Sequence, residues 1–226
     1  MFLFNNSGPI LRWKQAALDV QDLCGLITLH WRWGSRTVLR HHFTRIDQVF
    51  LVWGWVTACI FLTAQFLPIS WTVQAGLWSG LTLTGIVTMI RLAWFWVQVE
   101  RLRWVIYLWS GLMLLGVLVT TWGIFGGVGL ILLNLCALWL LLCAVGYLIM
   151  GLGMQSRSFL AAALVHSLSV LTLAPAWQFL TTAVVMAGSL LLFACVQWDM
   201  RLPVKPDMLS EEDIAFNQSQ QALRQL

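Results

Sequence analysis

Six long apolar runs, separated by short polar or turn-forming segments, occupy most of the chain after its first 48 residues. Each run is close to the about 20 residues that an α-helix needs to cross the hydrocarbon core of a bilayer. Turns at Pro68, Gly126 and Pro175 join the runs in pairs, as three hairpins. The pattern predicts six transmembrane helices at about Val49–Leu67, Trp71–Ile90, Trp104–Phe125, Val128–Met154, Phe159–Ala174 and Ala176–Trp198.

The composition places the chain in the same class. Hydrophobic residues make up 60% of it and charged residues 10%, whereas soluble proteins have about 45–50% and 25%. We therefore predict an all-α polytopic membrane protein in contact with the lipid bilayer. Its expected parts are a cytoplasmic amino-terminal segment at 1–47, a transmembrane domain at 48–198 and a polar cytoplasmic tail at 199–226. The uncharged first eight residues do not resemble a signal peptide, so we expect the first span to direct its own insertion.

The basic residues predict how the helices are oriented. All thirteen Lys and Arg residues lie before the first run, between the second and third, between the fourth and fifth, or after the sixth. Such residues mark the cytoplasmic side of short loops, and the turns on the other side carry no charge. We expect both termini in the cytoplasm, and the protein in a bacterial plasma or inner membrane or in an organellar membrane.

The segment from Arg91 to Arg103 has two interpretations. Residues 92–97 are too apolar for a simple loop, so the segment forms either an interfacial helix or the end of a long second helix. In the second case Arg91 lies just inside the membrane, where its long side chain reaches back to the interface.

Two patterns precede the first span. Apolar residues at steps of three and four between Ile10 and Ile27 predict an amphipathic helix. The alternation in Leu29–Trp33 and Thr37–Phe43, on either side of Gly34 and Ser35, predicts a small hairpin. The surrounding basic cluster is either a topology anchor or a contact for anionic lipids or a partner. Four residues of this cluster, and Arg91 later in the chain, are the candidates for that contact: Arg32, Arg36, Arg40, Arg45 and Arg91.

The polar tail after Trp198 predicts one short helix. Pro203 and Pro206 keep its first part extended, and Ser210 with Asp213 forms a plausible capping box. A helix of about sixteen residues is marginal alone, so this tail and the amino-terminal helix are the segments expected to contact another membrane or cytoplasmic protein.

Uncharged polar residues within the spans are candidates for a polar cavity or for hydrogen bonds between helices. Small polar side chains commonly join helices in membranes, and we favour that interpretation. His166, the only histidine in a span, is either a core residue bonded to a neighbouring helix or a metal, haem or proton-relay residue. The candidate set is Gln74, Thr82, Asn134, His166 and Gln178.

The sequence argues against most chemistry inside the bundle. Glu100 is the only acidic residue between Asp47 and Asp199, whereas proton and cation pathways usually need an intramembrane carboxylate. The five cysteines form no closely spaced pair of the kind that holds a disulfide or zinc. Ser79 and Ser110 lack the glycine that a rhomboid-type motif places two residues earlier. We therefore expect no catalytic residue, metal or cofactor, and no nucleic-acid partner.

Three functions remain in order of preference. The first is a non-enzymatic membrane protein that acts through partners, as an assembly factor, accessory subunit or organiser of a complex. The alternative is a transporter or channel for a small neutral or anionic solute, with the polar residues above lining its path. The third is a membrane enzyme with a lipid or quinone substrate.

Overall fold

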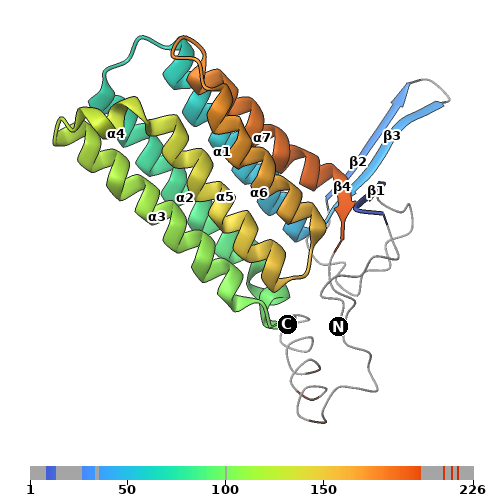
Figure 1. The fold of residues 1–226 in the computed structure, drawn as a ribbon. Helices are drawn as coiled ribbons and strands as arrows, with labels where there is room; N and C mark the ends of the chain where they lie inside the picture. Colours follow the sequence, from blue (N-terminus) through green and yellow to red (C-terminus); the bar gives the residue numbers. More distant parts are fainter. Residues whose placement is uncertain are drawn as a thin grey trace.

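A computed structural model describes residues 9–13, 27–33, 36–99 and 101–199, together with Glu211, Ala215 and Gln218. Figure 1 shows a bundle of roughly parallel and antiparallel helices, with short strands gathered at one end. The helices are α1 Arg45–Phe66, α2 Trp71–Val99, α3 Arg103–Phe125, α4 Gly129–Leu133, α5 Leu135–Gly153, α6 Arg157–Ser169 and α7 Gln178–Cys195. A 3₁₀ turn, η1 Val170–Thr172, extends α6.

The predicted class of polytopic helical membrane protein is confirmed. Among the described residues, α1, α2, α3, α5 and α7 are long and apolar enough to cross a membrane. The predicted fifth span corresponds to Arg157–Thr172, which is apolar but shorter. At a rise of 1.5 Å per residue it reaches about 24 Å, less than the about 30 Å of hydrocarbon. Of the six predicted spans, this segment is therefore the one whose helix is too short to cross the hydrocarbon core.

Two boundaries differ from the predicted ones. The predicted helix Val128–Met154 is divided at Asn134 into α4 and α5. The Asn134 amide donates to the carbonyl oxygen of Leu130, and such local side-chain bonds compete with regular helix. The segment from Arg91 onward follows the long-helix interpretation, because α2 continues without interruption to Val99.

The order of helices around the bundle brings the two ends of the transmembrane region together. Helix α1 packs against α2 and most extensively against α7, α3 packs against α2 and α5, and α6 packs against α5. The last long helix is therefore a neighbour of the first.

Glycines let bulky indoles approach the neighbouring helix backbone. A Cβ added at Gly116 of α3 would lie 2.7 Å from Cη2 of Trp139 on α5. One added at Gly146 of α5 would lie 2.8 Å from Cη2 of Trp109 on α3. The packing between α3 and α5 is thus reciprocal, because a tryptophan of each helix lies over a glycine of the other.

The strands lie outside the bundle. They are β1 Leu11–Trp13, β2 Ile27–Trp33, β3 Arg36–Phe43 and β4 Val196–Trp198. The hairpin predicted before the first span is confirmed: β2 and β3 pair antiparallel, with an irregularity between Trp31 and Arg32. A second sheet joins sequence-distant segments, because Leu11 pairs with Trp198 and Trp13 with Val196.

Two sequence predictions are corrected by these strands. The amphipathic helix predicted from Ile10 to Ile27 is wrong at its ends, since Leu11–Trp13 and Ile27 are extended; its middle lies outside the described residues. The predicted sixth span ends at Cys195 rather than Trp198, because Val196–Trp198 leaves the helix to pair with β1. Of the tail, the structure describes Glu211, Ala215 and Gln218 as helical.

Candidate functional site

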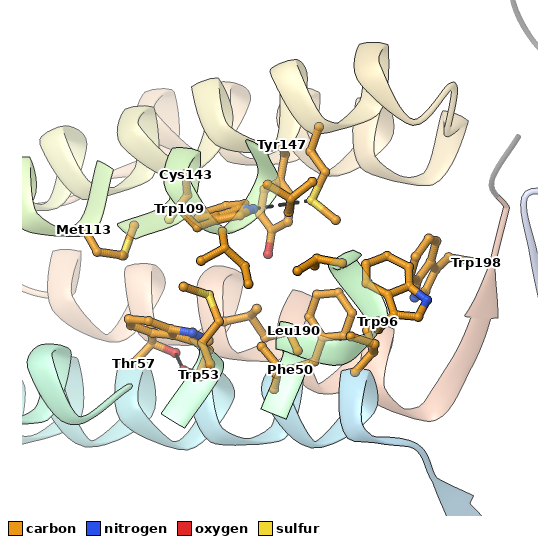
Figure 2. Close-up of a pocket in the computed structure, with 18 of the residues that line it drawn as sticks. Phe50, Trp53, Thr57, Trp96, Trp109, Met113, Cys143, Tyr147, Leu190 and Trp198 are labelled. Atoms are coloured by element: carbon orange, nitrogen blue, oxygen red, sulfur yellow. Dashed lines mark hydrogen bonds between the residues drawn. The ribbon is translucent and has the colours of Figure 1, made fainter. Parts of the chain in front are cut away.

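A cavity of about 90 Å³ lies between the helices, in the half of the bundle nearer the strands (Figure 2). Helices α1, α2, α3, α5 and α7 all contribute to its wall, as does Trp198 of β4. The lining is almost wholly apolar and rich in aromatic and methionine side chains: Ile46, Val49, Phe50, Trp53, Thr57, Met89, Ala93, Trp96, Val97, Val105, Ile106, Trp109, Met113, Cys143, Tyr147, Met150, Met186, Leu190 and Trp198.

Helical spacing explains how so many residues converge. On α1, Phe50, Trp53 and Thr57 follow one another at steps of three and four, and on α5 Cys143, Tyr147 and Met150 do the same. Residues at these steps share one face of a helix. Each helix therefore presents one stripe to the cavity, and its remaining apolar residues face lipid or other helices.

Tyr147 is the main polar feature of the cavity. The residue is 2% exposed, and Figure 2 shows its hydroxyl directed into the space between the helices. Its ring packs edge-on against Trp109, with centroids 5.0 Å apart, and is stacked on Phe159, with centroids 6.1 Å apart. Within the described residues the hydroxyl has no hydrogen-bond partner. The ring is thus fixed on both sides while its one donor points into the cavity.

The cavity lies towards the end of the bundle that carries the arginines. We define the basic end as the end at which α1 begins at Arg45, α3 begins at Arg103 and α6 begins at Arg157. The half-buried cavity residues Trp96 and Trp198 lie at this end (Figure 2). The other end consists of the turns near residues 67–70, 126–128 and 173–177.

Asp199 closes the basic end by joining three segments. Its carboxylate lies within 3.0 Å of five donor atoms: Ser156 Oγ, Arg157 N, Arg157 Nε, Ser158 N and Ser158 Oγ. The Ser158 hydroxyl also lies 2.8 Å from the carbonyl oxygen of Ile10. Asp199 therefore binds the first N–H groups of α6, where a negative charge is favoured, and ties them to the β1–β4 sheet. We call this arrangement the Asp199 clasp.

The clasp holds Asp199 ionised. Burial raises the pKa of its carboxyl, but the hydrogen bonds from Ser158 and Arg157 outweigh that effect and lower it to about 2. The ion pair with Arg157 is 3.0 Å long, and both side chains are largely shielded from solvent. A second capping arrangement starts α1, where Thr44 and Asp47 form a reciprocal capping box.

The structure distributes the predicted polar residues over the bundle rather than bringing them to the cavity. Gln74 is buried, and its amide donates to Thr63 Oγ1 at 2.9 Å and to the carbonyl oxygen of Ile60 at 3.2 Å. This bond joins α2 to α1. Thr82 is buried, Asn134 bonds within α4, and the backbone carbonyl of Gln178 accepts from Thr182. None of these side chains lines the cavity.

His166 lies close to the cavity wall but behind it. The residue is fully buried, and its ring centroid is 5.0 Å from that of Tyr147. Its Nδ1 lies 2.8 Å from the carbonyl oxygen of Ala162, one turn earlier in α6, while Nε2 has no partner among the described residues. His166 thus supports Tyr147 from outside the cavity. No three His, Cys, Asp or Glu side chains in the described ranges are grouped as a metal site would need.

The basic candidates occupy two places. Arg32 lies in β2, and Arg36 and Arg40 lie in β3, so all three belong to the hairpin. Arg45 is the first residue of α1, and Arg91 is an exposed residue of α2 eight positions before its end. The hairpin projects sideways from the basic end, away from the helices (Figure 1).

Neither Tyr147 nor Asp199, the two central residues of this region, was predicted from the sequence. Tyr147 falls one turn after Cys143 on a uniformly apolar helix, and periodicity does not mark a cavity on such a helix. Asp199 had a visible signal, because it is the first acidic residue after a long uncharged stretch and follows directly on the last span.

No protein-family model, curated protein or solved structure matches the chain.

Proposed function

We propose that this integral membrane protein acts through protein partners, as an assembly factor, accessory subunit or organiser, and binds them at its basic end. The observation that carries the proposal is the β2–β3 hairpin. Ile27 and Leu29 on β2 are 54% and 48% exposed, although the hairpin stands beyond the helices (Figure 1). Ile27 and Leu29 are two positions apart on β2, so both lie on one face of the strand, and this is the face at which we expect a partner to bind.

The hairpin is too small to be stable on its own. An isolated two-stranded hairpin is marginal in water, and a third strand or a packed face is usually needed. In the described part of the chain β2 and β3 pair only with each other. A partner that covers Ile27 and Leu29, or adds a strand at an edge, would supply the missing contacts.

The clasp supports the same proposal, because it gives the basic end a defined shape. The β1–β4 sheet and Asp199 bind the amino-terminal strand to the ends of α6 and α7. A partner would therefore meet an ordered surface here, whereas the opposite end offers only short turns.

Charge indicates the chemistry of the partner. The hairpin sequence contains Arg32, Arg36 and Arg40, so an acidic partner would complement its charge. Under the positive-inside rule this end faces the cytoplasm, and both termini lie there. The membrane would be a bacterial plasma or inner membrane, or that of an organelle.

The transport alternative has less support. The Gln74 amide is occupied by a helix–helix contact and that of Asn134 by its own helix. A solute path that used these two amides would have to break their bonds. The cavity is apolar and lies towards one end, which suits a solute pathway poorly.

The proposal is tested by removing the exposed apolar side chains of the hairpin. The double variant Ile27→Ser and Leu29→Ser is expressed in its native membrane, extracted in mild detergent and analysed by quantitative mass spectrometry. The matched control is Leu130→Ser with Leu133→Ser, two exposed residues of α4 at the other end. We expect a stoichiometric partner to be lost from the first variant only. An unchanged set of bound proteins in both variants would contradict the proposal.

A further inference from the structure

We propose that the apolar cavity binds the planar ring of a membrane-soluble quinone, with the Tyr147 hydroxyl donating a hydrogen bond to one ring carbonyl. This inference is independent of the proposed partner function, because it rests on the cavity and not on the hairpin. It differs from the sequence-based expectation of no cofactor, and it is closer to the third function considered there, a membrane enzyme with a lipid or quinone substrate.

Water does not suit this cavity. A buried water molecule usually needs two to four polar partners, and the wall of this cavity is almost wholly apolar. The Thr57 hydroxyl is already directed to the carbonyl oxygens of Trp53 and Gly54, at 2.8 and 3.0 Å. The matching ligand is therefore an apolar molecule that carries an isolated hydrogen-bond acceptor.

The shape of the wall favours a planar ring over a flexible chain. Phe50, Trp53, Trp96, Trp109 and Trp198 surround the space together with Tyr147 (Figure 2). Aromatic rings gain most from offset stacking or edge-to-face contact with other flat rings. A quinone presents such a ring and has carbonyl oxygens in its plane, where a phenol hydroxyl at the wall can reach them.

The cavity is smaller than one ring needs, so its wall must move to admit the ligand. An engineered apolar cavity of about 150 Å³ holds a benzene molecule, and the cavity here is about 90 Å³. Four methionines, Met89, Met113, Met150 and Met186, belong to the wall. Methionine side chains are unbranched and rearrange readily. The Sδ of Met150 accepts a hydrogen bond from Trp109 Nε1 at 3.3 Å, so we expect the other three methionines to make the room. The half-buried Ile46, Trp96 and Trp198 border the cavity where the remainder of the ligand would leave it.

The test is a titration of the purified full-length protein in detergent micelles with a decyl-substituted benzoquinone. Quinones quench indole fluorescence, so binding beside Trp53 and Trp109 should give a saturable decrease. The central variant is Tyr147→Phe, which keeps the ring and removes only the hydroxyl. The matched control is Tyr107→Phe, because Tyr107 is the other tyrosine of the chain and is 63% exposed.

We expect Tyr147→Phe to raise Kd about 5-fold, as the loss of one hydrogen bond predicts, and Tyr107→Phe to leave it unchanged. A second variant, Ala93→Leu, fills the cavity from α2 and should abolish the saturable quenching; it keeps the test decisive if Tyr147→Phe folds poorly. Equal Kd values for wild type, Tyr147→Phe and Ala93→Leu would overturn the proposal. Displacement of the quinone by an equal concentration of dodecanoic acid would also overturn it, because the cavity would then be a general acyl-chain site.

Discussion

The Asp199 clasp makes a quantitative prediction about stability. Asp199→Asn keeps the size of the side chain but removes its charge and replaces one acceptor oxygen with a donor amide. Three consecutive residues, Ser156, Arg157 and Ser158, place five donor atoms within 3.0 Å of the native carboxylate. The new amide group would face at least two of these donors, so their hydrogen bonds would be lost.

The expected loss follows from the kind of bonds involved. A hydrogen bond to a charged group contributes about 1.5–3 kcal/mol, and part of the ion pair with Arg157 remains screened by solvent. With two such bonds lost, each at the lower end of that range because of the screening, we expect Asp199→Asn to reduce the free energy of unfolding by about 3 kcal/mol. The matched control is Glu211→Gln, an exposed carboxylate outside the bundle, which should change it by less than about 0.5 kcal/mol.

The same carboxylate predicts how stability depends on pH. The pKa of Asp199 is about 2 in the folded protein, and about 3.9 is usual for an unfolded chain. The contribution of a group whose pKa is lowered by folding is complete above its unfolded pKa and is lost as the pH falls towards the folded value. The wild-type protein should therefore lose this part of its stability between about pH 4 and pH 2, and Asp199→Asn should not.

Both effects are measured by equilibrium unfolding in mixed micelles, with the mole fraction of a denaturing detergent as the variable and tryptophan fluorescence as the signal. If Asp199→Asn unfolded within about 0.5 kcal/mol of the wild type and kept the same acid dependence, the clasp would not stabilise the basic end as described.

The remaining predictions concern packing and orientation. Gly116→Ala should destabilise the protein by about 1–3 kcal/mol, because the new methyl group meets Trp139; Gly111→Ala, with open space around it, should be neutral in the same unfolding measurement. Gln74→Leu should cost about 1 kcal/mol through the lost α1–α2 hydrogen bonds, and an unchanged midpoint would contradict that role. In a cysteine-free background, an impermeant maleimide should label Arg101→Cys only from the cytoplasmic face. It should label Ile69→Cys only from the opposite face.

The sequence predicted most of what depends on local pattern. The apolar runs located α1, α2, α3, α5 and α7, because a helix in a membrane must satisfy its own backbone and needs a fixed length to do so. The alternation around Gly34 and Ser35 predicted the hairpin correctly, since hairpin pairing is local in sequence. The break at Asn134 was not predictable, because the uniformly apolar residues around it suit one long helix as well as two.

Features that depend on distant residues were not predictable in this way. The pairing of Leu11 with Trp198 spans most of the chain, and three residues at each end carry too little alternation to indicate it. The cavity requires side chains from five helices to converge, so no single periodic pattern marks it. The polar residues of α2 drew attention for their chemistry, but Gln74 is used in packing, as uncharged polar residues in membranes commonly are.

Photo-crosslinking at the hairpin in intact membranes tests most directly whether the protein acts through partners at its basic end. A photoreactive amino acid replaces Leu29 on β2 in one variant and Leu133 on α4, at the opposite end, in another; both side chains are exposed. We predict one discrete protein adduct at Leu29, lost when Ile27→Ser is added, and none at Leu133. Adducts with lipid alone at both positions would contradict a function exercised through partners at the basic end.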